Sequence, residues 1–406
     1  FGIMWAWILS ITLVPSMLRV LRWNLESNSF TKNSILENVI DKLGKLIVKK
    51  PKKILSIGIC ILLFGFIGLR MITVEVNIIN FFKNDSPIAK STNFVDENLT
   101  GSMSLIMRMN ADYTDSETLK YIDSLQSYLE KNIPSVRISL SIVDLIKQKY
   151  KSDFGEDTIP ESSDIINAYL SEFENFSSSD VESLIDTYDF QTGIINTLMK
   201  SISTAEIIEV TSEIEEYLNS NPPPSKDPIK ITGLLKFLND FVDLVIRSSI
   251  ASIFISVLII WLVSALFFKD IKFAFISIIP LLFAIVLNFG LMGLFGIELS
   301  HMTALLTSVI IGVGVDFAIH YINDAKKNKA EGVDIDSITI KTSNDVGYPI
   351  LLDVVSNMGF ASLLISEFIP LNYIGGLMVF AMVSTSVGTL TILASTIEIN
   401  RKKLFS

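Results

Sequence analysis

The stretch TSVIIGVGVDFAIHYIND (residues 307–324) decides the environment in which this chain folds. Its first nine residues are uncharged, and then come Asp316 and, four residues later, His320. A helix of about 20 apolar residues crosses the hydrocarbon of a membrane, where an ionisable side chain is costly. If this stretch spans a membrane, Asp316 must therefore face a protein interior or a wet cavity.

The whole chain has the composition of a membrane protein. Of its 406 residues, 50% are hydrophobic and 19% are charged, and the mean hydropathy is +0.49. These values are too apolar for a soluble globular protein. We expect six full spans, and an apolar segment at 1–18 that forms the end of a truncated helix. The predicted spans are 54–72, 250–268, 273–296, 302–322, 349–366 and 371–397.

The distribution of charge predicts which parts of the chain lie on each side of the membrane. Residues 71–247 carry 29 acidic and 14 basic side chains, whereas 19–53 carry nine basic and three acidic ones. Basic loops stay in the cytoplasm by the positive-inside rule. We therefore expect a basic cytoplasmic linker at 19–53, a basic cytoplasmic tail at 399–406 and an extracytoplasmic domain at 73–247. A five-helix bundle at 248–398 completes the predicted organisation.

The polar block between the first and second full spans has the pattern of a folded α+β domain. Apolar residues alternate in two predicted strands and recur at helical spacing in two predicted helices. The order is strand, helix, strand, an acidic helical insert at 144–188, and then strand, helix, strand, which is the split βαβ or ferredoxin-like pattern. The insert either keeps a surface solvated or selects a cationic cargo. The predicted elements are strand 102–110, helix 116–132, strand 136–143, strand 189–199, helix 203–219 and strand 229–232.

Two interpretations compete for Asp316. It is either a structural carboxylate that caps a neighbouring helix, or a group that binds an ion or a proton. Gly312 and Gly314 narrow the helix just before the acid, so that a second helix can approach closely. His320 lies at i+4 on the same face, where it is either a relay member or a satisfied polar residue near a helix end.

The next span has a polar face of its own. Asp353, Ser356 and Asn357 follow i, i+3, i+4 spacing, which places them on one side of a helix. Counted at 1.5 Å per residue, with Pro349 as the inner end of that span, Asn357 reaches the depth of Asp316. We therefore expect the two polar faces to meet. Loss of water favours the neutral form of a carboxyl group, so an acid in this position can bind and release a proton near neutral pH.

Several motifs resemble those of a known superfamily. GVGVDFAIHY (312–321) resembles the GxGxDYxIH-type motif in the fourth helix of each half of resistance–nodulation–division (RND) transporters. The likeness is greatest to the branch of MMPL-like lipid and hydrophobe exporters. WILSITLVPSML (7–18) and VKKPKKIL (48–55) resemble the end of a sixth helix and the entry to a seventh. ITGLLKFLNDFVDLVIRSS (231–249) is similar to the entry to the eighth helix, and NMGFASLLISEF (357–368) to the eleventh.

The resemblance implies a fold and a function. The chain would be the C-terminal half of a twelve-helix transporter, a partial sixth helix plus helices seven to twelve, with an extracytoplasmic porter domain. Its partner would be the missing N-terminal half. Such proteins export a lipid or another hydrophobic molecule from the cytoplasmic (inner) membrane, driven by protons that facing acids exchange. Asp316 matches the acid of the tenth helix, whereas the tyrosine that follows it in the family is Phe317 here, which cannot donate a hydrogen bond.

Other classes fit less well. An accessory subunit of the Sec translocation machinery has a similar half, but AIHYINDAKK (318–327) lacks its arginines. A lipid sensor of the sterol-sensing type shares the helical core. The sequence has no enzymatic motif and no zinc-ligand pattern, so we expect neither an enzyme nor a metal or cofactor site. We expect lipid and protons as partners, and no nucleic acid.

Overall fold

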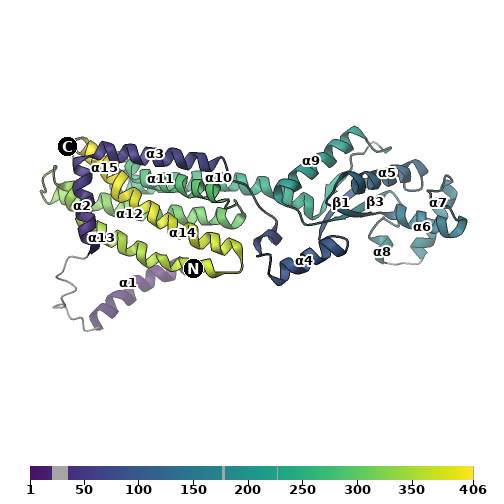
Figure 1. Ribbon diagram of the computed structural model, residues 1–406, viewed down its shortest axis with the longest axis horizontal. Coiled ribbons are helices and arrows are strands. Elements are labelled where there is room, and N and C mark those ends of the chain that lie inside the picture. The colour runs from purple at the N-terminus through teal and green to yellow at the C-terminus, as the bar shows by residue number, and fades with distance from the viewer. Residues whose placement is uncertain (21–34, 176–178, 226, 406) are drawn as a thin grey trace.

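A computed structural model of the chain describes residues 1–20, 35–175, 179–225 and 227–405. The molecule is elongated, with a helical bundle at one end and an α+β domain at the other (Figure 1). We call the end of the bundle nearer the α+β domain proximal and the opposite end distal. This architecture confirms the predicted fold class, a membrane helix bundle carrying a small α+β domain.

Within the described residues, six helical segments are long and apolar enough to cross a membrane, which agrees with the number of full spans that the sequence predicts. A shorter apolar helix, α1 (Gly2–Val20), precedes them. The spans are α3 (Pro51–Leu69), α10 (Gly233–Phe268), α11 (Ile271–Phe295), α12 (His301–Ala330), α13 (Ile338–Asn357) continued by the 3-10 helix η3 (Met358–Ile365), and α14 (Ile369–Val387) continued by the π-helix η4 (Gly388–Leu393) and by α15 (Ala394–Leu404).

Glycines let two of the spans pack backbone against backbone. A Cβ atom added at Gly68 of α3 would overlap the carbonyl group of Gly290 in α11. One added at Gly293 would in turn overlap the carbonyl oxygen of Gly68. Small residues of this kind allow membrane helices to approach closely where van der Waals packing drives their association. The α3–α11 pair is therefore a rigid part of the bundle.

An amphipathic helix, α2 (Ile35–Lys49), lies at the distal end before α3. It buries Ile40 and Ile47. Ile40 contacts α13 so closely that a Cβ atom at Gly347 would clash with its side chain. Leu46 and Val39 on other faces are exposed, so α2 presents both apolar and charged side chains at the edge of the bundle.

The α+β domain contains one antiparallel sheet with the strand order β2-β3-β1-β4. This is the order of a ferredoxin-like βαββαβ fold, as the sequence predicts. Helix α5 (Ser116–Asn132) follows β1, and α9 (Thr204–Ser220) follows β3. The strands are β1 (Met103–Asn110), β2 (Val136–Leu140), β3 (Thr192–Met199) and β4 (Lys230–Thr232).

The core of the α+β domain follows the predicted periodicities. In β1 the alternate residues are buried, and in α5 one stripe of residues is completely inaccessible. Both patterns are those of elements that bury a single face. The buried residues are Met103, Leu105, Met107 and Met109 of β1 and Leu119, Ile122, Leu125 and Leu129 of α5.

One predicted strand is shorter than its sequence pattern indicated. We expected alternation from 136 to 143, but β2 ends at Leu140 and Ser141 caps the next helix. A register shift between Val136 and Ile138 turns Ser139 inward, where its hydroxyl contacts Thr197 at 2.9 Å. A β-bulge changes which face each later residue occupies, and the alternation rule cannot detect it.

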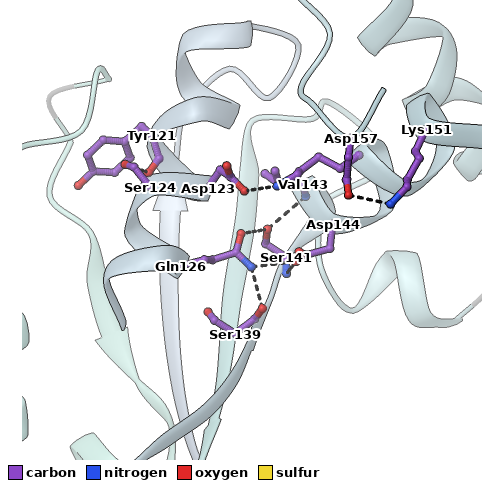
Figure 2. A network of polar contacts seen from close by, with 11 residues as sticks. Tyr121, Asp123, Ser124, Gln126, Ser139, Ser141, Val143, Asp144, Lys151 and Asp157 are labelled. Carbon is purple, nitrogen blue, oxygen red and sulfur yellow. Dashed lines mark hydrogen bonds and ion pairs between the residues drawn. The ribbon is translucent and has the colours of Figure 1, made fainter. Parts of the chain in front are cut away.

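In the insert between β2 and β3, the described residues form the helices α6 (Ile142–Phe154), α7 (Ser163–Asn175) and α8 (Ser179–Glu182). Polar contacts tie α6 to α5 (Figure 2). The amide of Gln126 donates to the carbonyl oxygen of Ser139 and to Asp144, each at 2.8 Å. Lys147 lies 2.8 Å from Asp123, and this hydrogen bond raises the pKa of the lysine. The insert is therefore a packed part of the domain.

Helix α10 belongs to both halves of the molecule. It is one uninterrupted helix of 36 residues, and it runs from the sheet into the bundle (Figure 1). The predicted boundary between domain and bundle, at residues 247 and 248, falls inside it. Arg247 and Asp243 form an exposed ion pair of 2.9 Å on this helix, which marks the last charged turn before the apolar part.

Candidate proton-relay site

A cavity of about 450 Å³ lies between α12 and α13. Its lining includes three titratable side chains: Asp316 and His320 from α12, and Asp353 from α13. Apolar side chains complete the lining, among them Ile350 and Pro349. The structure thus brings three of the predicted site residues together around one space.

The local sequence explains why these three side chains meet. Asp316 and His320 are four residues apart, so they lie one above the other on one face of α12. Helix α13 packs against α12, and Asp353 lies about one turn beyond Pro349 on it. All three side chains are exposed in this chain, because the cavity opens on one side of the bundle.

Neither acid is neutralised by a cation. Among the residues that the structure describes, no lysine or arginine forms an ion pair with Asp316 or Asp353. Carboxyl groups and an imidazole are side chains that can take up and release protons. The arrangement differs from that of a structural carboxylate held by a permanent partner.

The two glycines before Asp316 have different surroundings. A Cβ atom added at Gly314 would lie 3.1 Å from Thr385 of α14 and 3.2 Å from Leu281 of α11, so Gly314 allows close packing inside the bundle. Gly312 is exposed, and a Cβ atom there would meet nothing within 4 Å. Gly312 lies on the same face of α12 as Asp316 and His320. This face therefore carries no side chain one turn before Asp316.

Phe317 occupies another face of α12. It is 3% exposed and belongs to the hydrophobic core of the bundle, although its edge also lines the cavity. Its aromatic ring offers no donor to either carboxyl group. Phe317 therefore holds α12 in the bundle and contributes no polar group to the cavity.

The expected meeting of Asn357 with Asp316 is not what the structure shows. Asn357 is the last residue of α13, outside the cavity lining, and its amide donates to the carbonyl oxygen of Asp353 at 3.0 Å. We took Pro349 as the inner end of the span, but α13 begins at Ile338 and Pro349 lies inside it. The depth count was therefore wrong, and Asp353 takes the place expected of Asn357.

Comparison with known proteins identifies the family to which this bundle belongs. Residues 92–396 match the MMPL family. The chain belongs to the MMPL family. The match begins in α4 (Pro87–Asn98), which precedes β1, and ends in α15. It therefore includes the α+β domain and all three titratable groups of the cavity.

The MMPL chain is also similar to a protein of Methanocaldococcus jannaschii that is named only as a supposed membrane protein. The two sequences are 20% identical over 382 residues, which cover 91% of this chain and 96% of the relative. Together with the six apolar spans, these similarities establish a multi-pass membrane protein of the MMPL family.

A second polar cluster of this MMPL protein escaped the sequence analysis. At the distal end, the hydroxyl of Tyr321 contacts Ser343 at 2.9 Å, and Thr339 donates to Glu398 at 2.7 Å. Glu398 is 6% exposed and also accepts a hydrogen bond from Arg401. The cluster ties α12, α13 and α15 together behind the cavity. An acid directly after the uncharged run 371–397 was the signal that pointed to it.

Proposed function

We propose that this MMPL protein is a proton-driven exporter of a lipid or another hydrophobic molecule. Asp316 would bind and release the proton, with Asp353 and His320 as neighbours that exchange it. The open side of the cavity would face the other half of the transporter, which would supply the partner acid. The α+β domain would stand outside the cytoplasmic membrane and receive the cargo.

The observation that carries this proposal is the pair of unpaired carboxyl groups in one open cavity. Placing an acid inside a membrane bundle costs about 2.5–3.5 kcal/mol or more. A structural role would be expected to offset this cost with a fixed cation or a set of donors. In the part of the chain that the structure describes, the ion pairs leave both acids of the cavity out, which favours a group that changes its protonation.

The family supports export over the alternatives. The MMPL match covers the bundle and the α+β domain together, as expected for a transporter whose two parts act jointly. The sequence from Ala318 to Lys327 lacks the arginines of Sec accessory subunits.

The proposal is tested by Asp316→Asn, which keeps the shape of the side chain but cannot release a proton. We expect the variant to reach the membrane in normal amounts and to lose export almost completely. The test uses cells that lack the chromosomal gene and carry either the wild-type protein or Asp316→Asn. The measurement compares the lipids extracted from the outer surface of these cells with those extracted from whole cells.

Asp324→Asn is a matched control on the same helix. Asp324 lies two turns from Asp316 and accepts a hydrogen bond of 2.8 Å from Asn328, outside the cavity. This control should export normally. Normal export by Asp316→Asn would reduce Asp316 to a structural residue and remove the proposal.

A further inference from the structure

Residues 73–82, which we call the collar, connect the end of α3 to the α+β domain. The collar pairs with the loop between α11 and α12 through a parallel bridge of Val74 with Leu299. The backbone N–H of Glu75 donates to the carbonyl oxygen of Leu299 at 3.0 Å, and the N–H of Leu299 donates to Thr73 at 2.8 Å. The next residue, Ser300, caps α12, the helix that carries Asp316.

The side chain of Glu75 binds in the opposite direction, toward the α+β domain. It is 3% exposed. Its Oε1 accepts a hydrogen bond of 2.5 Å from the hydroxyl of Thr204, the first residue of α9, and one of 2.8 Å from the N–H of Asn77. Its Oε2 accepts a bond of 2.9 Å from the amide of Asn80. The hydroxyl of Thr204 also accepts a hydrogen bond of 2.9 Å from the backbone N–H of Val76.

Asn77 adds a second attachment to the same part of the domain. Its amide donates to the hydroxyl of Ser201 at 2.8 Å and to the carbonyl oxygen of Ile202 at 2.9 Å. Both acceptors lie between β3 and α9. The collar is thus bonded on one side to the loop that begins α12, and on the other to the loop that begins α9.

Aromatic contacts attach the rest of the collar to the bundle. The ring centroid of Phe81 lies 5.6 Å from that of His301, at the start of α12. Phe82 forms an antiparallel bridge with Phe368, just before α14, and their ring centroids are 5.3 Å apart. The proximal ends of α12 and α14 are therefore both held by this segment.

Glu75 differs from the other residues of the collar because it is an acid that is buried away from any lysine or arginine partner in the described structure. Among the described residues, no lysine or arginine pairs with it. A buried charge needs several hydrogen bonds to offset its loss of water, and charge-assisted hydrogen bonds are roughly twice as strong as neutral ones. The carboxylate thus joins three donors into one stiff unit that includes the start of α9.

We propose that the collar transmits displacements of α12 to the start of α9, with Glu75 as the positioning residue of this joint. The inference rests on the proposed function and adds to it that a change in the protonation of Asp316 displaces α12. Displacement of α12 would pass through Leu299 to the backbone of Glu75, and from its carboxylate to Thr204. The α+β domain would thereby respond to an event inside the membrane bundle.

The test asks whether an effect of Asp316→Asn crosses the joint. Hydrogen–deuterium exchange is measured on the purified full chain, in peptides that cover 296–303 on the bundle side and 200–208 on the domain side. In the otherwise unchanged protein, we expect Asp316→Asn to alter exchange in both peptides. In the Glu75→Ala background, the effect on 296–303 should persist and that on 200–208 should fall to less than half.

A milder variant and a matched control keep this result interpretable. Thr204→Val removes one hydroxyl group with almost no change of shape, and it should weaken transmission in the same direction. Asp144→Asn is the control, because Asp144 also accepts two hydrogen bonds, from the N–H of Ser141 and from the amide of Gln126, at 2.8 Å each and outside both peptides. These bonds lie within the α+β domain, so transmission should be unaffected.

The inference is overturned if the effect on 200–208 is undiminished in both Glu75→Ala and Thr204→Val. It is overturned equally if Asp316→Asn leaves 200–208 unchanged in the unaltered background, whatever happens at 296–303. Failure of the proposed function gives a different result, because Asp316→Asn cells would then export lipid normally. Lost export together with undiminished transmission would refute the joint alone.

Discussion

Glu298 is an acid of the membrane bundle whose pKa responds to the collar. It is half-buried in the loop between α11 and α12. Burial, and then the charge of Glu75, raise the pKa of its carboxyl group above the ordinary value of 4.5. The folded protein therefore binds this proton more tightly than the unfolded chain does. Stability rises as the pH falls through the raised pKa, and the ionised form lowers stability at neutral pH.

We predict that Glu298→Gln stabilises the protein at neutral pH. Glutamine stays uncharged, so the difference in unfolding temperature between the variant and the wild type should shrink between about pH 7 and about pH 4.5. Thermal unfolding followed across this interval measures the effect. Glu117→Gln on the exposed face of α5 serves as the control and should give no such trend. A constant difference at all pH values would contradict the prediction.

At the residue scale, the sequence predicted the cavity face of α12 well and the facing residues of α13 less well. The i, i+4 spacing of Asp316 and His320 placed both side chains on one face without any tertiary knowledge. The residue opposite them depended on where α13 begins, and Pro349 was a misleading marker, since proline is tolerated inside membrane helices when neighbours satisfy the freed groups. Exposure of Gly312 could not be predicted, because it depends on which helices surround it.

At the scale of the elements, the backbone contact between α3 and α11 can be tested by a single substitution. We predict that Gly290→Ala destabilises the protein by about 3 kcal/mol, because the added methyl group would overlap the backbone of Gly65 and push the two helices apart. The temperature at which the purified protein aggregates in detergent measures the loss. Export should fall in parallel with the amount of folded protein.

Gly376→Ala is the same substitution on α14, at a position where the new methyl group meets Leu364 at an ordinary distance of 3.6 Å. Alanine in a helix interior is favoured over glycine by about 0.5–1 kcal/mol, so this variant should be as stable as the wild type or slightly more stable. If the two alanine variants aggregated at the same temperature, backbone contact between α3 and α11 would not limit stability.

Elements with a long regular pattern were predictable, and elements altered by local irregularities were not. Helix α5 matches its predicted range, and β1 differs by one residue. The end of β2 was missed because the bulge before Ile138 and the capping box of Ser141 with Asp144 break the alternation. Both depend on hydrogen bonds to particular partners, which periodicity does not describe.

At the scale of the whole molecule, the predicted orientation can be tested with cysteines. Cys60 is the only cysteine and lies exposed on α3, inside a span. In a Cys60→Ser background, Ser152→Cys on α6 should react with a membrane-impermeant thiol reagent in intact cells. Lys403→Cys at the end of α15 should react only after the cells are permeabilised. Both positions are exposed. The reverse pattern would place the α+β domain in the cytoplasm.

The overall organisation was predictable because it follows from solvent and charge. Long uncharged stretches define spans with little dependence on tertiary detail, and the sides that the basic loops predict are what the cysteine experiment tests. The collar was not predicted, since it is held by contacts between residues far apart in the chain, such as Glu75 with Thr204. Periodicity and composition carry no information on such pairs.

Because α10 is one uninterrupted helix, the thickness of the bilayer affects the orientation of the α+β domain. The uncharged part of this helix, residues 248–268, is about 32 Å long, which is close to the thickness of the hydrocarbon layer, about 30 Å. When hydrophobic length exceeds this layer, a span tilts to hide its surplus. No break in α10 separates its membrane-spanning turns from the turns that contact β1. A thinner bilayer therefore tilts the α+β domain together with the helix, and a thicker bilayer reduces this tilt.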